Sequence, residues 1–354
     1  LEKEIFEQPD SIRDTTRGRF NKDFSSIVLG GINLKKDIKR ILFVGCGTAY
    51  YAGMLGKYYM ENIAKIPASV EISSEYKYKN NPTEEGTLVI AVSQSGETLD
   101  TLSALKEAQE KDLDTIAITN VVMSSIARQV PEGIYQRIGP EISVASTKAF
   151  TSQVALLLML AVALGRKNNL SQIESQKIIQ QIRYLPKLVE ETLLLVNDTC
   201  RKLASVFSMV PSVNFLGRQY MYPIALESAL KLKELAYINT SGYPSGEIKH
   251  GPLASIGRDS RCFLICPEEN LKDKNILTMK EISARGGDII LVKQKHQEFP
   301  KDSYGWEINI PKARDFLLPI LSVIPMQLFA MYSAKVRKFN VDQPRHLAKS
   351  VTVE

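Results

Sequence analysis

The stretch TLVIAVSQSGET, residues 87–98, decides the fold of this chain. Its first half is apolar at successive positions, which is typical of a strand buried on both faces of a parallel sheet. A helical pattern, residues 97–110, follows directly, and the next apolar run is DTIAITN, residues 114–120. Buried strands that alternate with helices of about 12 residues predict an α/β fold, with a parallel sheet covered by helices on both faces.

The same alternation extends to both sides of this stretch. Upstream, the sequence predicts a strand at 40–47, a helix at 49–62 and a strand at 68–72. Downstream, a long apolar helix at 147–166 closes this half of the chain. The following segment reads as a helical connector in which Pro186 marks a break, because a proline disfavours helical backbone at the preceding residue.

The pattern restarts in the second half. A strand is predicted at 213–217 and a helix at 223–238. RCFLICPE and DIILVKQ then repeat the character of LVIAVSQS and DTIAITN at an offset of about 172 to 174 residues. We therefore expect two tandem copies of one doubly wound, flavodoxin-like unit, each with a parallel sheet.

These patterns divide the sequence into five segments. The first is a charged helical lead-in that begins at Leu1 and looks like the cut end of a larger protein. The segments are 1–31 (lead-in and linker), 32–167 (first subdomain), 168–210 (helical connector), 211–340 (second subdomain) and 341–354 (C-terminal tail).

Composition excludes several classes of protein. The 354 residues are 44% hydrophobic and 24% charged, which rules out disordered and fibrous chains. The net charge of +6 is spread without long like-charged blocks, which argues against a nucleic-acid binder. Four cysteines form no disulfide framework, and three histidines offer no zinc spacing. With no signal peptide and no apolar run long enough to cross a membrane, we expect a reduced, cytoplasmic protein.

Two loops at predicted strand ends carry polar or small residues suited to ligands. GCG, residues 45–47, opens like a dinucleotide fingerprint, but Tyr50 stands at the third glycine position, so NAD is rejected and no cofactor is expected. In SQSGET, the loop enters a helix beside Gly96, and free amides, the helix dipole and hydroxyls together predict a phosphate site. The alternative is that Ser95 only caps the helix. VASTK, residues 144–148, is equally consistent with a cap of the following helix and with a ligand contact.

The second half contributes candidate acid–base residues. Glu227, Lys231 and Glu234 form one charged stripe on an otherwise apolar helix, so they are expected to line a cavity. Lys231 beside Glu234 would hold that carboxylate ionised, as a general base requires. His250, in the glycine-bracketed loop GEIKHGP, is a candidate acid or base, although a lone histidine is more often an ordinary core or surface residue.

The chain ends in HLAKSVTVE, whose alternating valines suggest a docked tail. Burial of Lys349 in such a tail would lower the pKa of its amine and free it for Schiff-base chemistry on a carbonyl.

Together, GCGT, SQSGET, VASTKAF, LKLKE, GEIKHGPL and LAKSVTVE resemble the isomerase domain of the glutamine–fructose-6-phosphate aminotransferase (glucosamine-6-phosphate synthase) family, part of the sugar isomerase (SIS) superfamily. The resemblance covers essentially the whole chain. GCGT and SQSGET are shared across the superfamily, whereas GEIKHGPL and LAKSVTVE are narrower and point to the synthases.

The resemblance implies roles for the matching residues. Glu234 would be the isomerising carboxylate, His250 the ring-opening histidine, Lys349 the Schiff-base lysine and Lys231 a second active-site lysine. The implied substrate contacts are Ser93, Gln94, Ser95 and Thr98 for the phosphate and Gly47, Thr48, Ala49, Val144, Ala145, Ser146 and Ala348 for the rest of the sugar. Ala49 stands where the family usually has serine, so the contact of that hydroxyl is not expected here.

The implied reaction converts fructose 6-phosphate and ammonia to glucosamine 6-phosphate, the first step of hexosamine and UDP-GlcNAc synthesis. In the family an N-terminal glutaminase domain supplies the ammonia, and the histidine comes from a neighbouring subunit, which implies a homodimer. No nucleic acid or membrane partner is expected. The alternatives are a fructosamine-phosphate deglycase or amino-sugar-phosphate deaminase of the same superfamily, and a sugar-phosphate sensor without catalysis.

Overall fold

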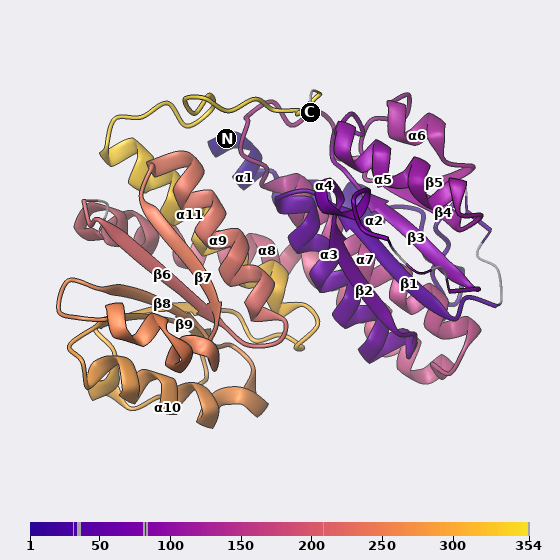
Figure 1. Ribbon diagram of the computed structural model, residues 1–354. Coiled ribbons are helices and arrows are strands. Elements are labelled where there is room, and N and C mark those ends of the chain that lie inside the picture. The colour runs from indigo at the N-terminus through magenta and orange to yellow at the C-terminus, as the bar shows by residue number, and fades with distance from the viewer. Residues whose placement is uncertain (31, 34–36, 81, 83, 208, 353–354) are drawn as a thin grey trace. The chain divides into compact units, whose positions relative to one another are not determined.

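The computed structural model describes residues 1–30, 32–33, 37–80, 82, 84–207 and 209–352 (Figure 1). The chain forms two compact units. The first unit comprises Glu7–Pro186 and Ala348–Glu354, and the second comprises Leu1–Phe6 and Lys187–Leu347. The five-segment division of the sequence stays a prediction, since the units follow contacts and not the order of the chain.

The first unit is built on a parallel sheet of five strands in the order β2-β1-β3-β4-β5. The strands are β1 (Arg40–Gly45), β2 (Ala68–Ile72), β3 (Thr87–Val92), β4 (Asp114–Thr119) and β5 (Glu132–Tyr135). Every residue of β3 is buried, as the sequence predicts. This strand order is that of flavodoxin-like doubly wound sheets, so the predicted fold class is confirmed.

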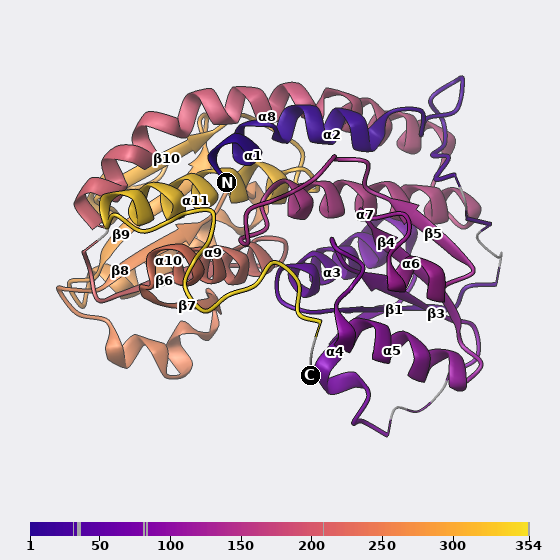
Figure 2. The same ribbon diagram turned by 90° about the horizontal axis from the view of Figure 1, so that it is seen from above.

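Helices cover both faces of this sheet. They are α2 (Gln8–Thr16), α3 (Thr48–Tyr59), which runs on as the π-helix η1 (Met60–Ala64), α4 (Ser73–Tyr76), α5 (Leu99–Glu110), α6 (Ser125–Gln129) and α7 (Lys148–Lys167). Figure 2 shows α3 and α7 on one face and α4 and α5 on the other. The apolar residues of α5 pack on β3 and β4 in a buried cluster, which fixes the loop between β3 and α5 at the carboxyl edge of the sheet.

The second unit repeats this architecture. Its parallel sheet has the order β10-β9-β8-β6-β7, the order of the first sheet read from the other edge. The strands are β6 (Ser212–Gly217), β7 (Asn239–Pro244), β8 (Arg261–Ile265), β9 (Asp288–Gln294) and β10 (Trp306–Ile310). The helices are α1 (Glu2–Phe6), α9 (Met221–Ala236), α10 (Lys272–Ser283) and α11 (Leu318–Val336), with short 3-10 turns η2 (Glu247–His250), η3 (Pro252–Ser255), η4 (Glu269–Leu271) and η5 (Lys301–Ser303). The duplication predicted from the sequence is therefore present in the structure.

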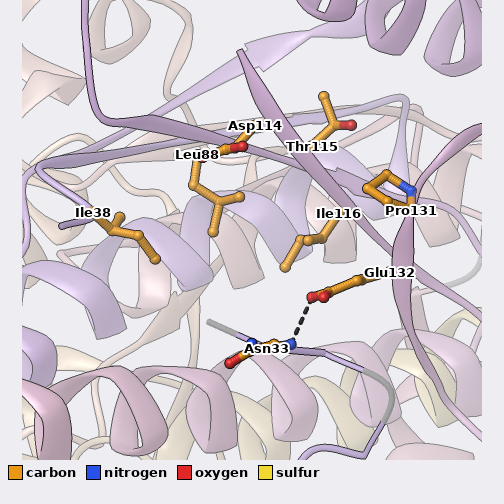
Figure 3. Close-up of a pocket in the computed structure, with 8 residues that line it drawn as sticks. All are labelled: Asn33, Ile38, Leu88, Asp114, Thr115, Ile116, Pro131 and Glu132. Carbon is orange, nitrogen blue, oxygen red and sulfur yellow. Dashed lines mark hydrogen bonds between the residues drawn. The ribbon is translucent and has the colours of Figure 1, made fainter. Parts of the chain in front are cut away.

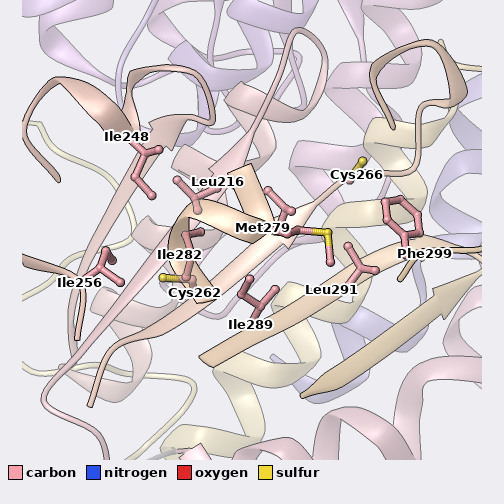
Figure 4. Close-up of a cluster of buried hydrophobic side chains, with 11 residues drawn as sticks. Leu216, Ile248, Ile256, Cys262, Cys266, Met279, Ile282, Ile289, Leu291 and Phe299 are labelled. Carbon is pink, nitrogen blue, oxygen red and sulfur yellow. The ribbon is translucent and has the colours of Figure 1, made fainter. Parts of the chain in front are cut away.

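The core of the second unit joins its sheet to α10. Cys262 lies in β8 and Cys266 directly after it, and Met279 and Ile282 of α10 belong to the same buried cluster (Figure 4). Burial raises the pKa of the Cys262 thiol to about 12. The cysteines therefore act as packing residues, as the apolar run CFLIC indicates.

One predicted boundary is wrong. The helix α8 (Gln172–Phe207) runs through Pro186, where the sequence predicted a break. A proline inside a helix costs about 3 kcal/mol. Here the helix buries a long apolar stripe on both sides of the proline, including Ile182, Leu185 and Val189. Burial of these side chains, at roughly 1.5–3 kcal/mol each, outweighs the local cost.

The expectation that no apolar segment is long enough to cross a membrane is wrong by length and composition, since two helices, α7 and α11, meet that criterion. Their most apolar windows are 100% and 89% buried inside the protein. Within the first unit α7 packs on α3 and α2, and within the second α11 packs on α9. Such burial is typical of helices in the core of a folded domain.

Candidate functional site

The turn between β3 and α5 has the geometry expected of an anion-binding loop. Gly96 has a φ of +67°, a backbone conformation that residues other than glycine rarely adopt. A Cβ at this position would lie 2.0 Å from Ser124 Oγ at the start of α6. The loop therefore packs closely enough on α6 that only glycine fits.

The hydroxyl groups of the loop are turned inward. Ser93 Oγ accepts a hydrogen bond from the Gly96 amide at 3.0 Å and lies 3.3 Å from Thr98 Oγ1. Ser95 Oγ accepts from the Glu97 amide at 3.2 Å. The alternative in which Ser95 caps the helix is wrong, because the N-cap of α5 is Thr98, whose side chain makes no capping hydrogen bond. The helix start thus has no side-chain cap and faces the hydroxyls of this loop.

Glu97, in the same loop, links it to α6. Its carboxylate accepts hydrogen bonds from the Ser125 amide at 2.9 Å and the Ser125 hydroxyl at 2.6 Å. These bonds lower the pKa of the Glu97 carboxyl. The only acid in SQSGET is therefore bound to α6, a contact that no local sequence pattern indicates.

The segment before α7 is organised by a residue that sequence reasoning missed. Glu141 has a fully buried carboxylate, and its Oε1 accepts hydrogen bonds from the amides of Thr147 at 2.9 Å and Ala149 at 3.1 Å. Thr147, the N-cap residue of α7, makes no capping bond through its own side chain. Between these anchors lie Val144, Ala145 and Ser146, the predicted sugar contacts.

The other oxygen of Glu141 binds the tail. Lys349 Nζ lies 2.6 Å from Glu141 Oε2, and the Val351 carbonyl accepts from the Leu99 amide at 3.2 Å. The tail is therefore docked within the first unit, at the start of α5. Lys349 is only part-buried: its side chain is 23% exposed, and it is ion-paired with a buried acid that lies far away in the sequence.

The charged stripe of the second unit lies on α9 as predicted. Lys231 Nζ is 2.7 Å from Glu234 Oε2 and 3.5 Å from Glu227 Oε1. The side chains of Glu227 and Lys231 are 0% and 1% exposed, whereas that of Glu234 is 20% exposed. Glu234 is thus the member of the stripe that is partly exposed to solvent.

His250 ends the short helix η2, in the second unit. It is exposed, and Gly251 follows with a φ of +135°. The imidazole therefore stands at the surface, at the end of a turn whose backbone direction depends on glycine.

The predicted residues fall into two sets. The first unit holds the SQSGET loop, residues 144–146, Ala348, Lys349 and the residues at the start of α3, namely Gly47, Thr48 and Ala49. The second unit holds Lys231, Glu234 and His250. That both sets form a single catalytic site stays a prediction.

A cavity of about 250 Å³ opens at the opposite edge of the first sheet (Figure 3). Leu88, Asp114 and Glu132 line it from the amino ends of β3, β4 and β5. Glu132 Oε2 accepts from the Asn33 amide at 2.6 Å. This cavity lies away from the loops described above. Among the described residues, no group of three or more His, Cys, Asp or Glu is placed to hold a metal ion.

The SIS-domain profile matches residues 36–163 and 207–337, the two copies seen in the structure. The chain belongs to the SIS-domain family. The glutamine–fructose-6-phosphate aminotransferase (isomerizing) of Caldanaerobacter subterraneus is 43% identical over 99% of this SIS chain, which spans 58% of that relative's length.

Solved structures agree with this assignment. The C-terminal domain of glucosamine-fructose-6-phosphate aminotransferase from Francisella tularensis has a TM-score of 0.91 and 36% identity, over 97% of each chain. A glucosamine-6-phosphate deaminase from Thermotoga maritima has a TM-score of 0.76 over 99% of this chain and 98% of its own, but only 22% identity. The second likeness shows the SIS fold alone.

Proposed function

We propose that this SIS chain is the isomerase part of a glutamine–fructose-6-phosphate aminotransferase, which converts fructose 6-phosphate and ammonia to glucosamine 6-phosphate and water. The observation that carries the proposal is the match to the Francisella tularensis domain over 97% of both chains. The site residues support it, because the phosphate loop, Lys349, Glu234 and His250 each have a part in this reaction.

The phosphate of the substrate would bind at the start of α5. Four polar residues, Ser93, Gln94, Ser95 and Thr98, surround the backbone of Gly96 there. A dianion would replace the bonds that Ser93 and Ser95 now make inside the loop, and it would gain the helix dipole. This anchors one end of the sugar and leaves its carbonyl end for chemistry.

The reaction then needs a base, an acid and an amine. His250 would open the sugar ring, and Lys349 would add to the C2 carbonyl and expel water to form an imine. Ammonia would displace the lysine, after which Glu234 would carry a proton from C1 to C2. One carboxylate suffices, since bonded carbons lie about 1.5 Å apart.

The surface position of His250 suits a histidine that serves a second subunit, which supports a homodimer. A glutaminase domain is the proposed source of ammonia, in keeping with the 58% of the relative that this chain spans. A cytoplasmic location fits free sugar phosphates as substrates.

The test is an assay of the purified chain with fructose 6-phosphate and an ammonium salt, with product identified by mass and by comparison with glucosamine 6-phosphate. We expect glucosamine 6-phosphate to accumulate only when both substrates are present. Turnover of fructosamine 6-phosphate with none of fructose 6-phosphate would instead identify a deglycase and refute the proposal.

A further inference from the structure

Glu141 has a buried carboxylate that the proposed function does not use. It lies within the first unit, and its two oxygens have different partners. Oε1 accepts from the amides of Thr147 and Ala149 at 2.9 and 3.1 Å, while Oε2 lies 2.6 Å from Lys349 Nζ. The side chain of Glu141 is 0% exposed, so its carboxylate is shielded from water, whereas that of Lys349 is 23% exposed.

We infer that Glu141 is the positioning residue and proton acceptor of Lys349. The inference rests on the proposed function, in which Lys349 attacks the substrate as a neutral amine. A lysine that donates to a carboxylate must give up a proton before its lone pair can attack a carbonyl. Glu141 Oε2, at hydrogen-bond distance, is placed to receive that proton.

The step balances as follows. A proton passes from Lys349 Nζ to Glu141 Oε2, and the nitrogen lone pair forms a bond to C2 of the open-chain ketose. The carbonyl oxygen takes up the two protons that remain on this nitrogen and leaves as water when the neutral imine forms. When ammonia displaces the lysine, the neutral amine is released and can recover the proton from Glu141.

Position matters as much as proton transfer. Leu347 and Val351, on either side of the lysine, are 46% and 53% exposed, so packing of these neighbours does not hold the tail. The ion pair to a buried acid fixes the long, rotatable side chain of Lys349. Since Oε1 of the same acid holds the first turn of α7, Glu141 links the lysine to the predicted sugar contacts at 144–146.

A neighbouring ion pair provides a matched control. Lys148, at the start of the same helix, pairs with Glu7 at 3.0 Å, and its side chain is 4% exposed. Glu7→Gln therefore removes a lysine–carboxylate pair from the same turn of α7 without touching Lys349.

The experiment compares the parent chain with Glu141→Gln, Glu141→Asp and Glu7→Gln. Glutamine keeps an oxygen that can accept from Thr147 and Ala149 but cannot take a proton. Each protein is incubated with fructose 6-phosphate and borohydride, and the label on Lys349 is followed by mass spectrometry. Kd for fructose 6-phosphate, KM and kcat are measured in parallel.

We expect Glu141→Gln to slow labelling and kcat by roughly 100-fold or more, the size of a lost proton-transfer group, with Kd and KM within about threefold of the parent. Glu141→Asp keeps an acid and should recover at least about tenfold of the loss, and Glu7→Gln should match the parent within about threefold. A purely structural Glu141 would instead raise KM and leave kcat unchanged.

Labelling of Lys349 at the parental rate in Glu141→Gln would overturn the inference while the proposed function stands. If Glu141→Gln does not fold, Glu141→Asp provides the test. A kcat of Glu141→Asp at or above the parental value, together with a raised KM, refutes the inference. Absence of label on Lys349 in the parent, with turnover intact, refutes the inference together with the imine step. Absence of both label and turnover overturns the proposed function as well.

Discussion

Glu268 is a buried acid that follows β8 at the carboxyl edge of the second sheet. Glu268 is only 2% exposed, and neither of its carboxylate oxygens has a hydrogen-bond partner among the residues that the structure describes. Burial raises the pKa of Glu268 to about 8, and the negative charge of Asp315 adds to the shift. The group is therefore mainly protonated in the folded protein near neutral pH.

This raised pKa predicts how stability depends on pH. Above about pH 4.5 the unfolded chain loses the proton that the folded chain keeps until about pH 8, so the free energy of unfolding falls as pH rises through this window. The slope from this group is at most about 1.4 kcal/mol per pH unit. Glu268→Gln should therefore have a melting temperature that falls less between pH 5 and pH 8 than that of the parent.

The control for this prediction is Glu298→Gln, which changes an exposed acid of the same unit. It should show the parental pH dependence. Equal slopes in the parent and in Glu268→Gln would contradict the raised pKa.

At the scale of elements, the turn between β3 and α5 depends on its contact with α6. Gly96→Ala would add a Cβ 2.0 Å from Ser124 Oγ at a φ of +67°. We expect the loop to shift, with a loss of about 1–3 kcal/mol in the free energy of unfolding and a Kd for fructose 6-phosphate raised at least about tenfold.

Gly18→Ala separates backbone strain from the contact. Gly18 has a similar φ of +70°, but a Cβ there meets nothing within 4 Å. This variant should lose about 1 kcal/mol from strain and keep the parental Kd, measured by calorimetry. Parental binding by Gly96→Ala would show that the turn does not hold the substrate.

The elements that sequence reasoning predicted correctly are those with strong local patterns. β3 and β4 were identifiable because a strand buried on both faces leaves a continuous apolar run, and the stripe on α9 because Lys231 and Glu234 share one helix face. The path of α8 through Pro186 was not predictable, since burial along the whole helix outweighs a local preference. Glu141 was missed for a similar reason, because its partner Lys349 lies at the other end of the chain.

At the scale of the whole molecule, duplication allowed the two copies to diverge. Where the first copy has SQSGET after β3, the second has CPEENL after β8, with Glu268 in place of small hydroxyl residues. The second loop therefore lacks the hydroxyl donors that the first loop offers to a phosphate. In the proposed function, the first copy would therefore hold the phosphate, while the second would supply Glu234 and His250.

If His250 acts on the site of a partner subunit, inactive variants should complement one another. In a mixed dimer of Glu234→Gln and His250→Ala, one site has both wild-type residues and the other has neither. Unfolding and refolding equal amounts together should restore about a quarter of the parental activity, because half of the dimers are mixed and each has one working site. No recovery, with mixed dimers confirmed by native mass spectrometry, would place both residues in the same subunit.

The role of Glu234 is the central claim, and one measurement tests it most directly: turnover of fructose 6-phosphate by Glu234→Gln, followed by NMR together with the Kd for the substrate. The expected result is a loss of roughly 100-fold or more in turnover with Kd within about threefold of the parent, because in the proposed function the carboxylate would move a proton and would not hold the phosphate. Turnover within about tenfold of the parent would contradict the account.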